Sequence, residues 1–210
     1  MKSKVLGFLA VGLLAGPMAA NAVSVTFNYT ADNIISIWGQ CAVASCASPA
    51  VTYAPGPNGS NWRVSDSLVV NLAPGTYSFA FFAQNLGTGS SGNPAGFLAE
   101  ILWGSNSLVS SSSWDVTTCT SSSCNYGGWT AATQYGTNGG ANIWRTANSN
   151  LPVAGISTAA NWIWTARNFN SSTDQFVAFR VNFTIVPEPG SLALLGLGLL
   201  GLGLTRRKAA

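Results

Sequence analysis

The most regular stretch of the sequence is VAFRVNFTI at residues 177–185, which alternates large apolar side chains with small or polar ones. Successive side chains of a β-strand point to opposite faces of a sheet, so this pattern places one apolar row against a core. The stretch is therefore predicted to form a strand, and its buried row consists of Val177, Phe179, Val181, Phe183 and Ile185.

Other segments towards the N-terminus show the same period of two. Residues 23–29 alternate strictly, and segments 63–72 and 76–84 flank a Pro-Gly pair, which is typical of a β-hairpin. The glycine- and serine-rich stretches 87–96 and 110–128 favour loops. Segment 97–103 fits either a strand or one to two helical turns. The shorter candidate strands are 33–38, 114–118, 142–146 and 161–166.

The composition of residues 23–186 also favours strands. Ser, Thr, Asn and Gly are abundant, whereas lysine is absent and Glu100 is the only glutamate. Lysine and glutamate usually fill helical surfaces, so few helices are expected. About eight strands separated by Gly, Ser and Asn turns predict one all-β domain, an antiparallel and jelly-roll-like β-sandwich.

The first 22 residues have the layout of a secretory signal peptide. Two lysines precede an apolar run at 5–16, which Pro17 ends. Ala20 and Ala22 place small residues at the two positions that a signal peptidase reads. The run is too short to span a membrane, so the sequence predicts export and cleavage after Ala22.

Residues 187–210 form a second targeting segment with three parts. The first is a proline–glutamate–proline motif, made of Pro187, Glu188 and Pro189. An apolar stretch at 191–204 follows, which as a helix would be ~21 Å long against ~30 Å of bilayer hydrocarbon. It predicts a short transmembrane helix whose cytoplasmic end is marked by a basic cluster, made of Arg206, Arg207 and Lys208.

This tail resembles the PEP-CTERM sorting signal of Gram-negative bacteria, a short segment also catalogued as an "ice-binding protein C-terminal domain". The resemblance implies processing by an exosortase, a membrane-embedded transpeptidase-like enzyme, and cleavage near the motif. It also implies an intermediate tethered in the inner membrane, which is then released to the cell surface or the extracellular matrix. An ordinary C-terminal membrane anchor is the alternative.

The charge of the body excludes several classes of function. Between residues 23 and 186, five acidic residues face four arginines, which gives a net charge of −1. A near-neutral body lacks the clustered cations that nucleic-acid binding needs. Because this region has neither His nor Lys, a Ser-His-Asp triad and Schiff-base chemistry are excluded, and no metal or cofactor is expected.

Four cysteines occur in two pairs with equal spacing, Cys41 with Cys46 and Cys119 with Cys124. An exported protein meets an oxidising compartment, so disulfides are expected, and the short spacings favour two local bridges. A cross-strand connectivity and a four-cysteine zinc site remain as alternatives.

All eight tryptophans lie in the body, many of them beside amide or hydroxyl side chains. A flat ring can stack on the apolar face of a sugar, and its polar neighbours can bond the sugar hydroxyls; a place in the core is the other interpretation. The sequence thus predicts a non-enzymatic, structural or adhesive protein that contacts exopolysaccharide. Its candidate contact residues are Trp62, Trp114, Trp129, Trp162 and Trp164.

Features of the sequence suggest two alternative functions. A secreted glycoside hydrolase or lyase needs two carboxylates, and Glu100 with Asp115 is the nearest pair in sequence. Ice binding is suggested by the catalogue label of the tail, but threonines at 117, 118, 130, 133 and 137 form no regular ladder.

Overall fold

The computed structural model describes residues 22–31, 33–41, 51–87, 93–120, 124, 127–140, 148–165 and 174–186. These residues form an all-β structure of two antiparallel sheets. The candidate strand 142–146, residues 1–21 and residues 187–210 lie outside the described residues.

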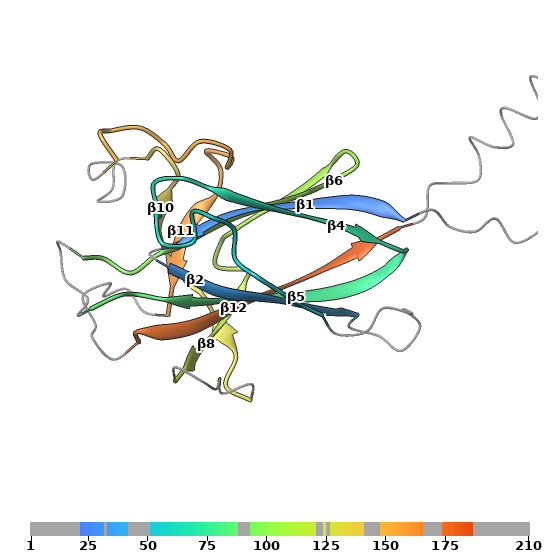
Figure 1. Cartoon of the computed structure of the whole chain (residues 1–210), viewed down its shortest axis with the longest axis horizontal. Coiled ribbons are helices and arrows are strands. Elements are labelled where there is room, and N and C mark those ends of the chain that lie inside the picture. The colour runs from blue at the N-terminus through green and yellow to red at the C-terminus, as the bar shows by residue number, and fades with distance from the viewer. Residues whose placement is uncertain are drawn as a thin grey trace, which may run out of the picture.

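Sheet A has the strand order β10-β11-β6-β1-β4, and β7 also pairs with β6. In Figure 1 it is the upper layer. Its members are β1 (Val23–Ala31), β4 (Asp66–Leu72), β6 (Phe97–Trp103), β7 (Asn106–Val109), β10 (Thr133–Thr137) and β11 (Asn161–Trp164).

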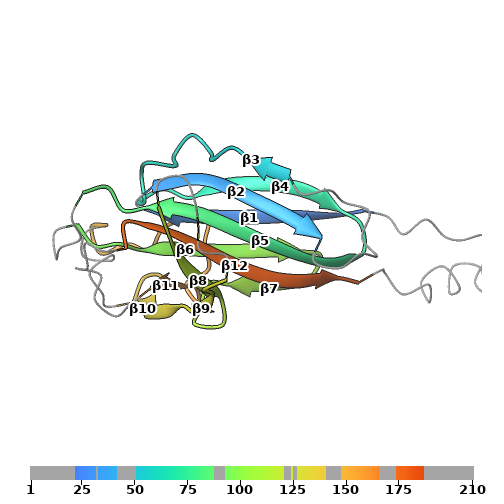
Figure 2. The ribbon, with the colours of Figure 1, turned by 90° about the horizontal axis from the view of Figure 1, so that it is seen from below.

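Sheet B has the order β3-β2-β5-β12-β8-β9. Figure 2 shows this side of the molecule, where β2, β5 and β12 lie side by side. Its members are β2 (Asn33–Cys41), β3 (Val51–Tyr53), β5 (Gly75–Gln84), β8 (Asp115–Cys119), β9 (Thr130–Ala131) and β12 (Phe176–Ile185).

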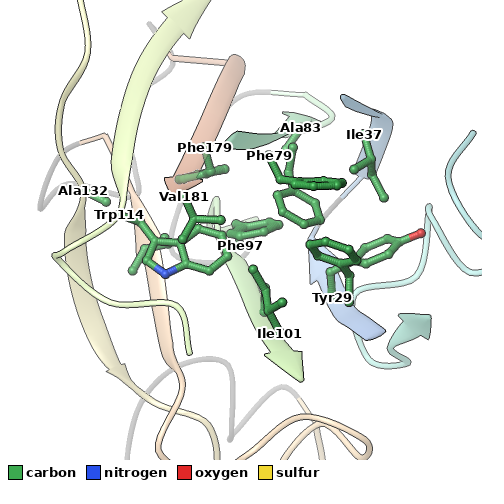
Figure 3. Packing of buried hydrophobic residues seen from close by; sticks show 14 of the residues in the cluster. Tyr29, Ile37, Phe79, Ala83, Phe97, Ile101, Trp114, Ala132, Phe179 and Val181 are labelled. Atoms are coloured by element: carbon green, nitrogen blue, oxygen red, sulfur yellow. The ribbon is translucent and has the colours of Figure 1, made fainter. Parts of the chain in front are cut away.

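The core between the sheets is rich in aromatic rings. Phe97 of sheet A stacks on Phe179 of sheet B (Figure 3), with ring centroids 4.5 Å apart. Phe27 meets Phe79 at 4.4 Å. All five apolar residues predicted for the buried row of 177–185 belong to this cluster. The strand prediction for that stretch is confirmed, as are those for 23–29 and 76–84.

The predicted hairpin around Pro74 is wrong. β4 and β5 lie in different sheets, because Leu72 pairs with Val23 of β1 whereas Gly75 pairs with Ile185 of β12. Both strands carry an apolar face, and a Pro-Gly turn between two such strands can join them within one sheet or across the sandwich. Local turn chemistry does not distinguish these two outcomes.

Segment 97–103 is a strand rather than a helical turn. Phe97, Ala99 and Ile101 point into the core, while Leu98 packs on the other face of the sheet. Because both faces are buried at this end, the segment shows a continuous apolar run instead of an alternation.

The strand order also departs from the jelly-roll expectation, in which the first and last strands are neighbours. β1 lies between β4 and β6 in sheet A, and β12 lies between β5 and β8 in sheet B. The short strands β3, β7, β9 and β10 were not predicted, since they span only two to five residues each and have little apolar periodicity.

A second, smaller cluster covers part of the outer face of sheet A. Leu98 and Trp162 point outward from the sheet and are covered by Val153, Ile156 and Ala160 of the loop that precedes β11. Asn138 holds this loop, because its amide nitrogen donates to the carbonyl oxygens of residues 153 and 156 and its oxygen accepts from the residue 153 N–H at 2.8 Å.

Candidate functional site

Three of the five candidate tryptophans are buried, which removes them as contact surfaces. Trp114, Trp162 and Trp164 are 1%, 1% and 2% exposed. The indole N–H of Trp114 donates to the Val109 carbonyl at 3.0 Å, and that of Trp164 donates to the Asp174 carbonyl at 3.2 Å. These rings fill the protein interior, as large aromatics in a β-sandwich commonly do.

Trp162 and Trp164 are two residues apart and would share one face of a regular strand, but they pack in different clusters. Trp162 belongs to the small cluster outside sheet A, whereas Trp164 belongs to the core between the sheets. β11 ends at Trp164, so the alternation of its side chains does not extend through that residue.

The other two candidates are half-buried, and each carries an arginine on its ring. The Arg63 guanidinium lies 4.7 Å from the Trp62 ring centroid, and the Arg180 guanidinium lies 4.4 Å from that of Trp129. Trp62 also meets Trp162 edge-on at 6.0 Å, which places it beside the covered part of sheet A. Trp129 directly precedes β9 at the edge of sheet B, and the Arg180 side chain reaches it from β12, which lies on the other side of β8.

The outer face of sheet B brings together residues that sequence reasoning did not combine. One row of directly paired residues crosses all six strands of this sheet. In order from β3 to β9 the row contains Thr52, Trp38, Ala80, Arg180, Asp115 and Ala131. Trp38 could have been found from the sequence, because the apolar Ile37 beside it points inward and leaves Trp38 outward.

Large side chains lie over small ones on this face. Ala80, Ala178 and Ser78 point outward, yet they are only 7%, 3% and 5% exposed. Their neighbours on the same face include Trp38 and Phe82, which are half-buried. Phe82 stacks on Phe176 with centroids 6.3 Å apart. We infer from this burial that the larger side chains of this face pack over the small residues.

We name this surface the platform. It consists of Trp38, Gln40, Ser78, Ala80, Phe82, Trp129, Phe176, Ala178, Arg180 and Asn182.

The charge on the platform is compensated. Arg180 donates from Nε and Nη2 to one oxygen of Asp115, at 3.0 and 2.6 Å. Both side chains are about one-third exposed, so this surface ion pair contributes little to the free energy of unfolding. With this pair compensated, the platform presents rings and amides with no net charge.

The other described carboxylates are engaged by the protein itself. Asp66 accepts hydrogen bonds from the N–H and the amide nitrogen of Asn58, Asp174 accepts from the Thr165 hydroxyl, and Glu100 accepts from the Ser157 N–H at 2.9 Å. Glu100 lies on the outer face of sheet A and Asp115 on the outer face of sheet B. The core separates the two, so they do not face a common cleft.

A hollow of about 190 Å³ lies between the edge strands β3 and β4. Its lining includes the Tyr53 ring and the amides of Gln40 and Asn71. Burial raises the pKa of the Tyr53 hydroxyl, so the group stays neutral at ordinary pH. Gln40 belongs to both the hollow and the platform, so the two surfaces adjoin at β2.

The cysteines bear out one of the two local bridges. Cys119 and Cys124 form a disulfide, which contradicts the cross-strand connectivity and the four-cysteine zinc site. Cys41 ends β2, and Cys46 lies outside the described residues, so the second bridge stays a prediction. Among the described residues, no group of three or more His, Cys, Asp or Glu side chains is placed to hold a metal ion.

The domain ends where the predicted sorting segment begins. β12 stops at Ile185, which is buried, and Val186 is exposed. Residues 186–208 match the family model of the PEP-CTERM protein-sorting motif. The chain carries an exosortase sorting signal. The motif Pro187, Glu188 and Pro189 and the basic cluster at 206–208 lie within the matched residues, as predicted.

A PEP-CTERM signal indicates an exported protein of a Gram-negative bacterium that an exosortase sorts at the membrane. Comparisons with curated proteins and with solved structures found no match. No helix in the described part of the chain is long and apolar enough to cross a membrane. The predicted span at 191–204 lies outside that part.

Proposed function

We propose that this protein is a non-enzymatic component of the cell surface or extracellular matrix, with a structural or adhesive role in contact with exopolysaccharide. The observation that carries the proposal is the position of the folded body. It begins at Val23, directly after the predicted signal-peptide cleavage point, and ends at Ile185, directly before the sorting signal. The predicted signal peptide and the sorting signal can therefore both be removed without loss of any described strand.

The adhesive role draws support from the surface of the body. A receptor for a neutral polymer needs rings and hydrogen-bonding groups rather than charge, and the body has a net charge of −1 with the platform compensated. The carboxylates support the absence of catalysis. Glycoside hydrolysis needs two carboxyl groups within about 5–10 Å across an open site. Glu100 and Asp115 lie on opposite outer faces, and Asp66 and Asp174 bond groups of the protein itself.

The route to the surface combines both ends of the chain. Signal peptidase cleaves after Ala22, the apolar stretch at 191–204 holds the exported chain in the inner membrane, and exosortase cuts near the motif at 187–189. The body is then released to the surface layer. In the described part of the chain, no structural observation favours the ice-binding or the hydrolase alternative.

The test uses the natural host and its own polymer. Fractionation should recover a processed body of lower mass than 21.7 kDa in the surface or matrix fraction, and the purified protein should be retained on exopolysaccharide from the same cells. Intact precursor in the cytosol would contradict the localisation. A processed protein that passes through the polysaccharide column without retention would contradict the adhesive role.

A further inference from the structure

We infer that the platform on the outer face of sheet B is the polysaccharide-binding surface of this protein, and that it takes an uncharged polymer whose sugar rings stack on Trp38 and Trp129. The inference rests on the proposed function and assigns the surface and the ligand chemistry within it.

The first argument is the concentration of partly exposed rings on one face. Trp38, Phe82 and Phe176 point outward from adjacent strands β2, β5 and β12, and Trp129 lies beside them over Arg180. Neighbouring strands are about 4.8 Å apart, and β9, which Trp129 directly precedes, is the fourth strand from β2 in sheet B, so Trp38 and Trp129 are spaced by roughly 15–20 Å. Several consecutive sugar units span such a distance.

The second argument is the orientation of the rings. The near-complete burial of Ala80 and Ala178, which point outward, requires the larger side chains of the same face to lie over them. A ring laid against small residues turns its other face to solvent. Such a face offers stacking area with little loss of side-chain entropy on binding, because the packing beneath it already restricts the ring.

The third argument is polar complementarity. Gln40 and Asn182 lie in the row next to Trp38, Ala80 and Arg180 and supply amide groups, whereas Ser78 between them is buried. The one cation, Arg180, is held between Asp115 and the Trp129 ring. An anionic polymer would find no unpaired cation on the platform, whereas sugar hydroxyls would find donors and acceptors.

Among the residues that the structure describes, the outer face of sheet A lacks this combination. Its largest ring, Trp162, is covered by the loop that Asn138 holds, and Trp62 packs edge-on against it. Trp62 is therefore a matched control, because it is also a half-buried tryptophan with an arginine guanidinium over its ring.

The experiment measures retention of the full chain, kept in mild detergent, in native gels that contain the host's exopolysaccharide separated into neutral and acidic fractions. The wild type should be retained by the neutral fraction. Trp38→Ala and Trp129→Ala should each weaken apparent affinity about tenfold, as for other aromatic anchors, whereas Trp62→Ala should leave it within about twofold. Asn182→Ala, at an exposed strand position, should weaken affinity about threefold without affecting folding.

Folding is checked by thermal unfolding of each variant, and size-exclusion chromatography shows whether the platform joins two copies of the chain. If the wild type is retained but Trp38→Ala, Trp129→Ala and Asn182→Ala are retained equally well, the inference fails and the proposed function stands. Retention by the acidic fraction alone overturns the assignment to an uncharged polymer. A dimer that the Trp38→Ala variant dissolves assigns the platform to self-association and overturns it as well. No retention on either fraction overturns both the inference and the proposed adhesive role.

Discussion

The two sheets use their outer faces differently, although both are built from strands with the same period of two. Sheet A places Leu98 and Trp162 outward and covers them with a loop, so a second apolar cluster forms outside the sandwich. Sheet B places Trp38 and Phe82 outward and leaves them half-buried. An outward aromatic is therefore a structural residue on sheet A, where a loop covers it, whereas on sheet B it stays half-buried and is, as we propose, a contact residue.

The largest effect is expected when one tryptophan on each outer face is truncated, which tests whether the two faces differ. Trp162→Ala should lower the free energy of unfolding by about 3–5 kcal/mol, because it leaves a cavity in a closed cluster. Trp38→Ala should cost about 1–2 kcal/mol, since part of its ring already faces water. Urea unfolding followed by circular dichroism measures both values. Equal losses would mean that the two outer faces are not distinct.

The loop that covers sheet A can be tested through the residue that holds it. Asn138 is 1% exposed, and its side chain makes three hydrogen bonds to the backbone of residues 153 and 156. Asn138→Ala leaves buried backbone groups without partners and should cost about 2–4 kcal/mol. Hydrogen exchange should show faster exchange confined to residues 148–160. Unchanged protection there would show that the loop is held by its apolar contacts alone.

A pH titration sharpens the comparison at Tyr29 of β1, an inner strand of sheet A. Burial raises the pKa of the Tyr29 hydroxyl above its usual 10.0; the Gly56 N–H hydrogen bond opposes the rise, and Asp66 adds to it. A raised pKa in the folded state means that this contribution is present below about pH 10 and is lost as the pH rises through the folded value. Stability should thus fall above about pH 10.

The matched variant is Tyr29→Phe. It should cost about 1 kcal/mol at neutral pH through the lost hydrogen bond, and its alkaline decline should be shallower than that of the wild type. The alkaline decline of Tyr29→Phe is compared with that of Tyr53→Phe, because burial raises the pKa of the Tyr53 hydroxyl as well. Identical alkaline slopes for wild type and Tyr29→Phe, in thermal melts between pH 8 and 11, would exclude this source of the pH dependence.

The smallest effect is expected at the ion pair on sheet B. Asp115→Asn should lower stability by less than about 1 kcal/mol, because both partners are about one-third exposed, and the loss should shrink as salt is raised. Melting temperatures at low and high salt measure this. A loss of several kcal/mol would mean that Asp115 also organises the turn that carries Trp129.

Much of the fold follows from the sequence where alternation is long. The rows of β1, β5 and β12 could be assigned residue by residue, because a strand with one buried face fixes the direction of every side chain. The turn after β4 could not be assigned, since the choice between hairpin and sheet-to-sheet crossing depends on strands far away in sequence.

The candidate site was less predictable for the same reason. Trp114, Trp162 and Trp164 have polar neighbours like those of Trp62 and Trp129, so local composition gave no means of separating buried rings from partly exposed ones. Their burial depends on elements that pack from elsewhere, such as the loop after residue 148. The platform itself is a product of strand order, because β2, β5 and β12 are adjacent only in space.

The start of β1 and the end of β12 lie at the same end of the sandwich, since Val23 pairs with Leu72 and Ile185 pairs with Gly75 just beyond it (Figure 1). A tether at either terminus of the chain would therefore hold the domain by the same end of the sandwich. On the route that we propose, the opposite end lies farthest from the bilayer while the precursor is still held there. We therefore expect contact with the proposed polymer to begin before the second cut.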